Sequence, residues 1–255
     1  MSAEAGVLAP AAAHSPRRRL GALAASRGDL GLALTVIAWV AVVLPLDSAG
    51  STRELLLGVV TWLLLFVLLR RESATTRAQV AVVVAFATLI EYTFSAGLGV
   101  YVYRLHHVPA YVPPGHGLVY LAALAIGRSA VVIAGRRWLL PATVVVAGGY
   151  ACWGLFVAER PDLLGFLWFC CLLLWVRSAR APLVFVGAFL VVTYLELLGT
   201  ALGTWTWSLH DPTGLVAIGN PPSGAAGGYG FFDAAALAFA PRIVSWLSVV
   251  RRRIT

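Results

Sequence analysis

The 255-residue chain is 60% hydrophobic and only 12% charged, and its mean hydropathy is +0.86. Because a soluble domain carries about a quarter charged residues, this composition excludes a water-soluble globular protein and predicts helices that span a membrane. The net charge is +8 and all cationic side chains are arginines, most of them clustered at the ends of apolar runs. This is the positive-inside pattern of membrane proteins, so the basic charge does not indicate nucleic-acid binding.

Residues 1–28 are rich in Ala, Arg and Pro, and we expect them to form a disordered cytoplasmic tail. Eight apolar runs follow, and each is a candidate transmembrane helix, although the sixth is short for a span. They cover residues 29–46, 54–70, 78–100, 116–135, 138–158, 162–176, 182–203 and 224–249. Arginine clusters precede the first run and follow the second, fourth, sixth and eighth. The sequence therefore predicts an all-α, polytopic helical bundle in the inner (cytoplasmic) membrane, with both termini in the cytoplasm.

The third and seventh runs end in similar motifs, which indicates an internal repeat. Glu91 precedes the segment GLGVYVYRLHH and then PPGHG, whereas Glu196 precedes TALGTWTWSLHD and then NPPSG. Corresponding residues are separated by 104 to 108 positions. Each half contains four spans, an even number, so both halves begin on the same side of the membrane. We therefore expect two parallel four-helix repeats, residues 29–136 and 137–255. Both motifs then lie on the outer side of the membrane.

Four ionisable residues lie inside apolar runs: Glu91, Arg128, Glu196 and Asp233. A charged group at that depth costs at least a few kcal/mol, so it generally faces a cavity, pairs with another charge or acts on a substrate. We expect the three acids to be catalytic, because carboxyl groups that share an apolar pocket divide into a proton donor and a proton acceptor. Arg128 is a candidate for substrate binding, and a structural ion pair with one acid is the alternative.

Four of the five histidines belong to the two outer motifs: His106, His107, His116 and His210. His106 and His210 occupy matching positions of the repeat and are candidate catalytic residues, whereas His116 is a candidate substrate-binding residue. With Asp211 and the glutamates they offer ligands that suit zinc or iron. The helical spacings His-x-x-His and His-x-x-x-His are absent, however, so we expect neither a metal nor another cofactor.

The two motifs resemble those of the membrane carotenoid-biosynthesis family that includes bisanhydrobacterioruberin hydratase. In that family a buried Glu precedes a G-x-x-x-Y-x-Y block, and a later G-x-W-x-W block precedes Pro and Asn residues that open a helix. Here the first block runs from Glu91 through GLGVYVY, and the second is GTWTW followed by Gly219-Asn220-Pro221-Pro222.

The resemblance implies cofactor-independent hydration, cyclisation or isomerisation of an isoprenoid or carotenoid-like lipid. A protonated Glu donates to a trisubstituted alkene, and aromatic faces stabilise the tertiary carbocation that results. Glu91 and Glu196 are then acid and base in either order, and Asp233 is a third candidate. His106 and His210 position water. The wall of the site consists of Tyr101, Tyr103, Trp205 and Trp207, with His116, Asn220 and Arg128 as further substrate contacts.

Two other classes of function remain open. Parallel repeats and ionisable residues near the midplane are also features of transporters, so a transporter or flippase for a lipid or small solute is the first alternative. An accessory subunit of a cell-envelope complex is the second, and it would tolerate the replacement of Glu91 and Glu196 by Gln. The expected partner is a lipid or isoprenoid within the membrane, and the large apolar surface leaves homo-oligomerisation open.

Overall fold

The computed structural model describes residues 16–50, 53–178 and 181–254. In this part of the chain, eight α-helices are joined by short connections, one π-helical turn and two three-residue strands. In chain order they are α1 (Pro16–Ser48), α2 (Glu54–Leu69), α3 (Ala74–Glu91), the π-helical turn η2 (Tyr92–Gly97), β1 (Tyr101–Tyr103), α4 (Val112–Arg128), α5 (Ala130–Phe156), α6 (Leu163–Ser178), α7 (Pro182–Ala201), β2 (Trp205–Trp207) and α8 (Ala225–Ile254).

Five of the described helices are long and apolar enough to cross a membrane. These spans are Ser26–Ser48, Ala74–Gly97, Ala130–Phe156, Pro182–Ala201 and Ala225–Val250. Helices α2 and α6 are also apolar but shorter. The protein is therefore a helical membrane protein, as its composition predicts.

The expectation of a disordered tail over residues 1–28 is wrong for residues 16–28. Helix α1 begins at Pro16, so residues 16–28 belong to a helix, whereas residues 1–15 lie outside the described part of the chain. The segment 17–25 is rich in Arg, Leu and Ala, which are strong helix formers, and it extends the first apolar run without a break.

The expected boundary between the fourth and fifth spans is also wrong. Helix α4 ends at Arg128 and α5 begins at Ala130, so the expected division of the chain at 136/137 falls inside α5. Ser129 has an extended backbone, and its hydroxyl accepts a hydrogen bond from the backbone N–H of Val132 at 3.4 Å. This is an N-cap, which begins a new helix in the middle of a continuous apolar run.

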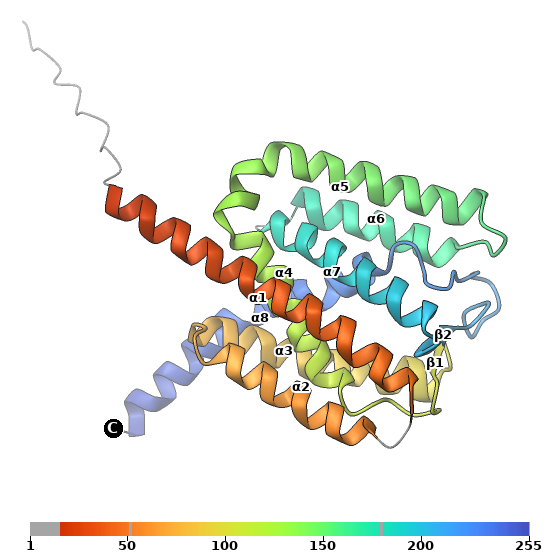
Figure 1. The fold of residues 1–255 in the computed structure, drawn as a ribbon, viewed down its shortest axis with the longest axis horizontal. Coiled ribbons are helices and arrows are strands. Elements are labelled where there is room, and N and C mark those ends of the chain that lie inside the picture. Colours follow the sequence, from red (N-terminus) through yellow and green to blue (C-terminus); the bar gives the residue numbers. More distant parts are fainter. Residues whose placement is uncertain (1–15, 51–52, 179–180, 255) are drawn as a thin grey trace, which may run out of the picture.

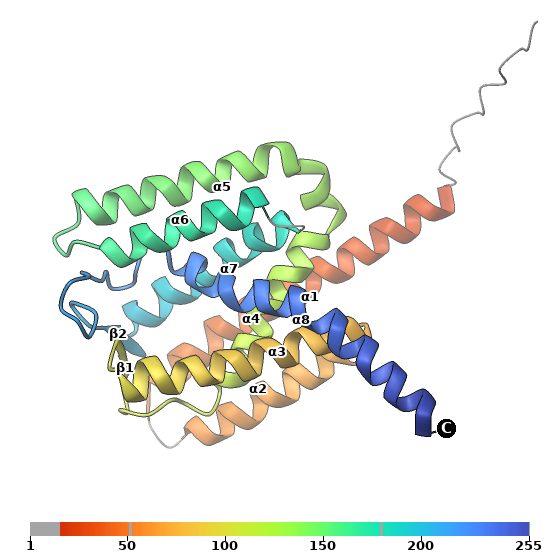
Figure 2. The ribbon, with the colours of Figure 1, turned by 180° about the vertical axis from the view of Figure 1, so that it is seen from behind.

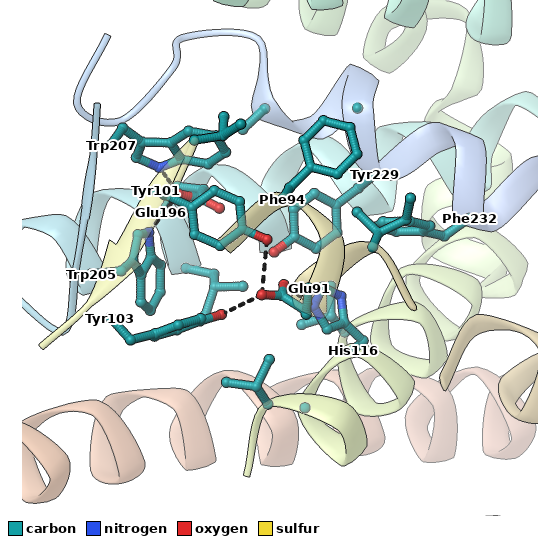
Figure 3. A pocket seen from close by; sticks show the side chains of 18 of the residues that line it. Glu91, Phe94, Tyr101, Tyr103, His116, Glu196, Trp205, Trp207, Tyr229 and Phe232 are labelled. Carbon is teal, nitrogen blue, oxygen red and sulfur yellow. Dashed lines mark hydrogen bonds and ion pairs between the residues drawn. The ribbon is translucent and has the colours of Figure 1, made fainter. Parts of the chain in front are cut away.

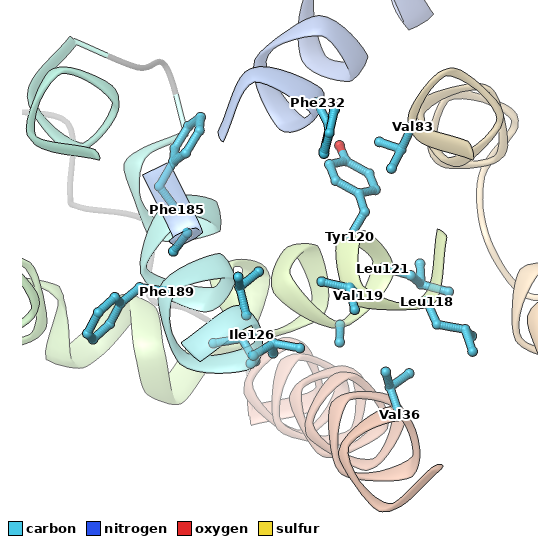
Figure 4. Close-up of a cluster of buried hydrophobic side chains, with 14 of the residues drawn as sticks. Val36, Val83, Leu118, Val119, Tyr120, Leu121, Ile126, Phe185, Phe189 and Phe232 are labelled. Atoms are coloured by element: carbon cyan, nitrogen blue, oxygen red, sulfur yellow. The ribbon is translucent and has the colours of Figure 1, made fainter. Parts of the chain in front are cut away.

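Helix α4 lies at the centre of the bundle (Figure 1). Its buried side chains pack against those of α1, α3, α7 and α8, and Figure 4 shows Tyr120 between Val83 and Phe232 within this core. Small residues let α4 and α7 approach closely. A Cβ added at Gly127 would lie 2.8 Å from the backbone of Leu183, and one at Gly187 would lie 2.4 Å from the carbonyl oxygen of Ala123. Such close backbone packing is the usual way for helices to associate within lipid.

The two ends of the bundle differ. The described start of α1 and end of α8 lie at one end, together with the turn between α2 and α3, and the strands β1 and β2 lie at the opposite end (Figures 1 and 2). The strands β1 and β2 pair antiparallel, although about a hundred residues separate them along the chain. This ribbon joins the segment after α3 to the segment after α7 and forms one side of the site described next.

Candidate active site

A cavity of about 560 Å³ lies beneath the β1–β2 ribbon. We call it the central cavity, and most of its lining is apolar or aromatic. Its polar lining includes Glu91 of α3, His116 of α4 and Glu196 of α7, which are 5%, 6% and 3% exposed. Figure 3 shows the two glutamates and the histidine among the rings of the ribbon and of α8. Its volume is in the range of small-molecule binding pockets.

Three side chains are hydrogen-bonded to the carboxylate of Glu91. The hydroxyls of Tyr101 and Tyr103 both donate to Oε2 at 2.8 Å, and Nε2 of His116 lies 2.8 Å from Oε1 (Figure 3). Burial, followed by the nearby charge of Glu91, raises the pKa of both tyrosines well above the ordinary value. The two phenols therefore stay protonated at physiological pH and remain hydrogen-bond donors to the carboxylate.

Glu196 has a different set of partners. The indole N–H groups of Trp205 and Trp207 donate to the same oxygen, Oε2, at 3.0 and 3.1 Å. An indole N–H can donate but cannot accept a hydrogen bond, whereas a tyrosine hydroxyl or a neutral imidazole can do both. The two tryptophans are thus fixed donors to Glu196, whereas the partners of Glu91 can reverse their roles. The hydroxyl of Tyr229 is a further hydrogen-bond partner of Glu196.

The rings of both motifs lie on one face of the ribbon because side chains alternate between the two faces of a strand. In the antiparallel register, Tyr101 lies opposite Trp207 and Tyr103 lies opposite Trp205. All four are buried, whereas Val102 and Thr206, between them, are exposed on the other face. The aromatic-x-aromatic pattern therefore places every ring of both motifs on the side of the glutamates.

A glycine bends the chain two residues before each strand. Gly99 has a φ of 63° and Gly203 a φ of 65°, a backbone conformation that glycine adopts without steric cost. Gly99 follows Glu91 by eight residues, whereas Gly203 follows Glu196 by seven. The π-helical turn η2 lies within the longer interval and is wider than an α-helical turn, so it accommodates the extra residue. Such π-helical turns occur frequently at functional sites.

Two residues that were not predicted from the sequence, Arg160 and Asp162, hold the segment 207–223 in place. Asp162, which is 2% exposed, accepts hydrogen bonds from the backbone N–H groups of Gly165, Gly219 and Ser223 and from the hydroxyl of Ser223, at 2.6 to 2.9 Å. Arg160 donates to three backbone carbonyls of this segment, those of Trp207, Ser208 and Ile218. An Asp just before an apolar run is an N-cap signal, and this signal could have identified Asp162.

Several candidate residues lie outside the central cavity. His106 and His210 are exposed, and neither lines the cavity, so the structure does not bring them to the glutamates as expected. His107 lies 2.7 Å from Glu54, at the start of α2. Asn220 is exposed and does not line the cavity either; its side-chain oxygen accepts a hydrogen bond from the backbone N–H of Trp207 at 3.0 Å, so it supports the ribbon.

Arg128 and Asp233 are also separate from the central cavity. The guanidinium of Arg128 lies at the end of α4 and pairs with Glu72, at 2.6 and 2.8 Å, and with Asp29, at 2.7 Å. The structure thus fits the alternative of a structural ion pair better than substrate binding. Asp233 is 4% exposed, and it does not line the central cavity.

Among the described residues, no group of three or more His, Cys, Asp or Glu side chains is arranged to hold a metal ion. The chain matches no family model, no curated protein and no solved structure. The residues that the structure brings together are two buried carboxylates and an imidazole in an aromatic cavity.

Proposed function

We propose that the protein is an integral membrane enzyme that performs cofactor-independent acid–base chemistry on an isoprenoid or carotenoid-like lipid. The reaction is a hydration, cyclisation or isomerisation at the outer half of the bilayer. In this proposal the chain spans the inner membrane eight times, as two parallel four-helix halves with both termini in the cytoplasm. The proposed relationship to the carotenoid-biosynthesis family rests on the two motifs alone.

One observation carries the proposal: Glu91 and Glu196 line the same apolar, aromatic cavity. Two carboxyl groups within a membrane domain are costly, and here each is held by side chains of the repeated motifs rather than by a cation. An arrangement that only stabilised the fold would favour ion pairs of the kind that Arg128 makes with Glu72. A proton donor and a proton acceptor on one apolar pocket are what alkene protonation requires.

The hydrogen-bond partners suggest which glutamate has which role. Glu91 is surrounded by groups that can reverse their hydrogen bonds, so it can lose and regain a proton without leaving a partner unsatisfied. Glu196 faces two indole N–H groups that can only donate, and these favour a carboxylate. We therefore assign Glu91 as the acid that protonates the alkene and Glu196 as the base that activates water or removes a proton.

The aromatic wall supports a cationic intermediate. The rings of Tyr101 and Trp207 lie 4.6 Å apart and those of Trp168 and Trp207 5.8 Å apart, and all three residues line the central cavity. A carbocation formed next to Glu91 would meet aromatic faces on this side, and such faces attract cations by about 0.5 to 2 kcal/mol each.

The position of the cavity supports a lipid substrate. Phe94 of η2, Leu167 of α6 and Phe231 of α8 line the cavity and are 37%, 46% and 48% exposed. The cavity is thus bordered by side chains that would face the acyl chains. An isoprenoid tail could enter between these helices without crossing water.

Mass spectrometry of total lipid and pigment extracts tests the proposal in a host that makes isoprenoid precursors. The host carries the wild-type gene, no gene, Glu91→Gln, Glu196→Gln or the control Glu159→Gln, which changes an exposed glutamate away from the cavity. We expect a new species, either one water heavier than a precursor or an isomer of it, with the wild type and Glu159→Gln only. If both cavity variants still make the new species, the assignment of the glutamates is wrong. Identical extracts from all hosts would favour a transporter or an accessory subunit.

A further inference from the structure

The central cavity contains more acidic than basic side chains. Among the described residues that line it, the acids are Glu91, Glu196 and Asp211, and the one basic side chain is His116. His116 is bonded to Glu91, and Asp211 accepts hydrogen bonds from its own turn. Arg160, which contacts the end of the ribbon, donates to backbone carbonyls and does not line the cavity. Glu196 is therefore the cavity acid for which the described residues provide no ion pair.

The hydrogen bonds of Glu196 favour its ionised form. The indole N–H groups of Trp205 and Trp207 both donate to Oε2, at 3.0 and 3.1 Å. Hydrogen bonds to a carboxylate are stronger than those to a neutral carboxyl group, so both tryptophans stabilise the negative charge. Glu196 is only 3% exposed, and a buried charge without a counter-ion is a costly arrangement within a membrane domain. A positively charged ligand would supply the missing charge.

Three aromatic rings gather beside this carboxylate. The rings of Tyr101 and Trp207 lie 4.6 Å apart with their planes inclined by 46°, and the ring of Trp168 lies 5.8 Å from that of Trp207 at 76°. Figure 3 shows Tyr101 and Trp207 next to Glu196. Because the planes are turned against one another, the ring faces point in different directions. Aromatic faces that surround one space attract cations, and proteins bind ammonium groups in this way.

The rest of the cavity suits apolar substituents. Aliphatic side chains of α1 and α4 line it, namely those of Val40, Val43, Leu44, Leu118 and Val119. The volume of about 560 Å³ is that of a pocket for a drug-sized molecule, so the cavity is larger than an ammonium group alone requires. A ligand that matches the cavity therefore combines one positive charge with an apolar body.

We propose that the central cavity binds an apolar organic cation, such as a quaternary ammonium group that carries an apolar tail, with Glu196 as its counter-ion. Trp207, Tyr101 and Trp168 provide the ring faces. The inference rests on the proposed function for the assignment of Glu196 as the carboxylate, but it requires no reaction. In the proposed reaction the carbocation occupies the same place, so a stable cation competes with the substrate.

Equilibrium binding to the purified full-length protein in uncharged maltoside micelles tests the proposal. The probe is tritiated geranyltrimethylammonium, and the reference is its neutral isostere, in which a carbon atom replaces the nitrogen. The two molecules have the same shape and differ in charge. Because each probe partitions equally into the micelles of every variant, the ratio of their affinities is compared between variants. We expect saturable binding of the cation to the wild type.

Glu196→Gln is the first variant, because the amide keeps an oxygen that both indoles can reach and removes the charge. We expect the preference for the cation over the isostere to fall about tenfold, whereas Glu91→Gln should leave it unchanged. Trp168→Leu removes one ring face without removing a hydrogen bond to Glu196, and it should lower the preference about threefold or more. The control is Trp153→Leu, which changes an exposed tryptophan of α5 that does not line the cavity.

Three outcomes would overturn the cation site. They are the absence of saturable binding of geranyltrimethylammonium to the wild type, a preference that Glu196→Gln leaves unchanged, and a preference that falls with Glu91→Gln instead. Thermal melts in the same micelles show which variants fold. If Glu196→Gln does not fold, Trp168→Leu decides, and a preference equal to that of Trp153→Leu would overturn the site.

The lipid extracts separate this inference from the proposed function. Cation binding with the expected pattern of variants, but no new lipid in any extract, would uphold the cation site and contradict the enzyme. A new lipid without any preference for the cation would uphold the enzyme and overturn the cation site. If both hold, geranyltrimethylammonium added to wild-type membranes lowers product formation, and its neutral isostere does so less.

Discussion

Tyr101 and Trp207 face each other across the β1–β2 ribbon, with ring centroids 4.6 Å apart, and each is hydrogen-bonded to a different glutamate. Tyr101 donates to Glu91, and Trp207 donates to Glu196. The same short ribbon therefore joins two motifs that lie about a hundred residues apart and positions both carboxyl groups on one cavity. A change that moves one ring should disturb the glutamate that it contacts.

Gly199→Ala should move Trp205. A Cβ at this position of α7 would lie 2.0 Å from the Trp205 ring, so the indole must shift and weaken its bond to Glu196. Because small displacements of catalytic groups can cost about 100-fold in rate, we expect product formation to fall by about that factor. Gly149→Ala in α5 is the matched control, because a Cβ there meets nothing within 4 Å. Equal product formation in the two variants would contradict this geometry.

Asp162→Ala should destabilise the segment 207–223. The change leaves three buried backbone N–H groups without an acceptor, at a cost of about 1 to 3 kcal/mol each. We expect a large fall in melting temperature in nanodiscs, and a smaller fall for Asp162→Asn, which keeps one oxygen. A melting temperature for Asp162→Ala within a degree or two of that of Glu159→Gln would show that Asp162 does not hold the segment.

The pair of His107 and Glu54 should make stability depend on pH. The hydrogen bond that His107 donates to the carboxylate of Glu54 raises the pKa of His107 above its ordinary value. The added stability is fully present below about pH 6.5, the unfolded pKa of histidine, and is lost as the pH rises through the higher folded pKa. The His107 side chain is 56% exposed, so the effect is about 0.5 kcal/mol or less.

Melting temperatures of the wild type and His107→Asn measure this dependence. The difference between them should shrink between about pH 6 and pH 9. The control is His106→Asn, which changes the exposed neighbouring histidine and leaves the contact between His107 and Glu54 in place. A difference for His107→Asn that grows with pH would have the wrong sign for this pair.

Arg128→Gln should affect stability but not chemistry. Arg128 makes a bidentate ion pair with Glu72 and a third hydrogen bond to Asp29, and it does not line the central cavity. Because the Arg128 side chain is 33% exposed, we expect its replacement to lower the free energy of unfolding by roughly 1 kcal/mol. Product formed per amount of folded protein should equal that of the wild type. A specific loss of product formation would restore Arg128 as a substrate contact.

Much of the site could be predicted from the two motifs. The intramembrane positions of Glu91 and Glu196 indicated a cavity, and the four aromatic residues of the motifs were expected to form its wall. The pairing of β1 with β2 was not predicted, because it joins segments that no local pattern connects.

Other parts of the site depend on tertiary contacts that the sequence does not encode locally. His106 and His210 were chosen because their positions match in the repeat, but the loops carry both side chains away from the cavity. Asp233 lies on α8 one helical turn after Tyr229, which lines the central cavity, but Asp233 itself does not. The end of α4 was missed because one N-cap serine interrupts a continuous apolar run.

The most direct test of acid catalysis at Glu91 and Glu196 is the origin of the hydrogen that is added to carbon. Membranes that contain the wild type, Glu91→Gln, Glu196→Gln or Glu159→Gln are incubated in deuterium oxide buffer with lipid extract from the host that lacks the gene. Because protonation of an alkene forms a carbon–hydrogen bond with an enzyme proton in exchange with solvent, we predict a product with carbon-bound deuterium for the wild type and Glu159→Gln. The Glu91→Gln and Glu196→Gln membranes should form little or none. Wild-type membranes that add no carbon-bound deuterium to any isoprenoid of the extract would contradict the acid–base mechanism.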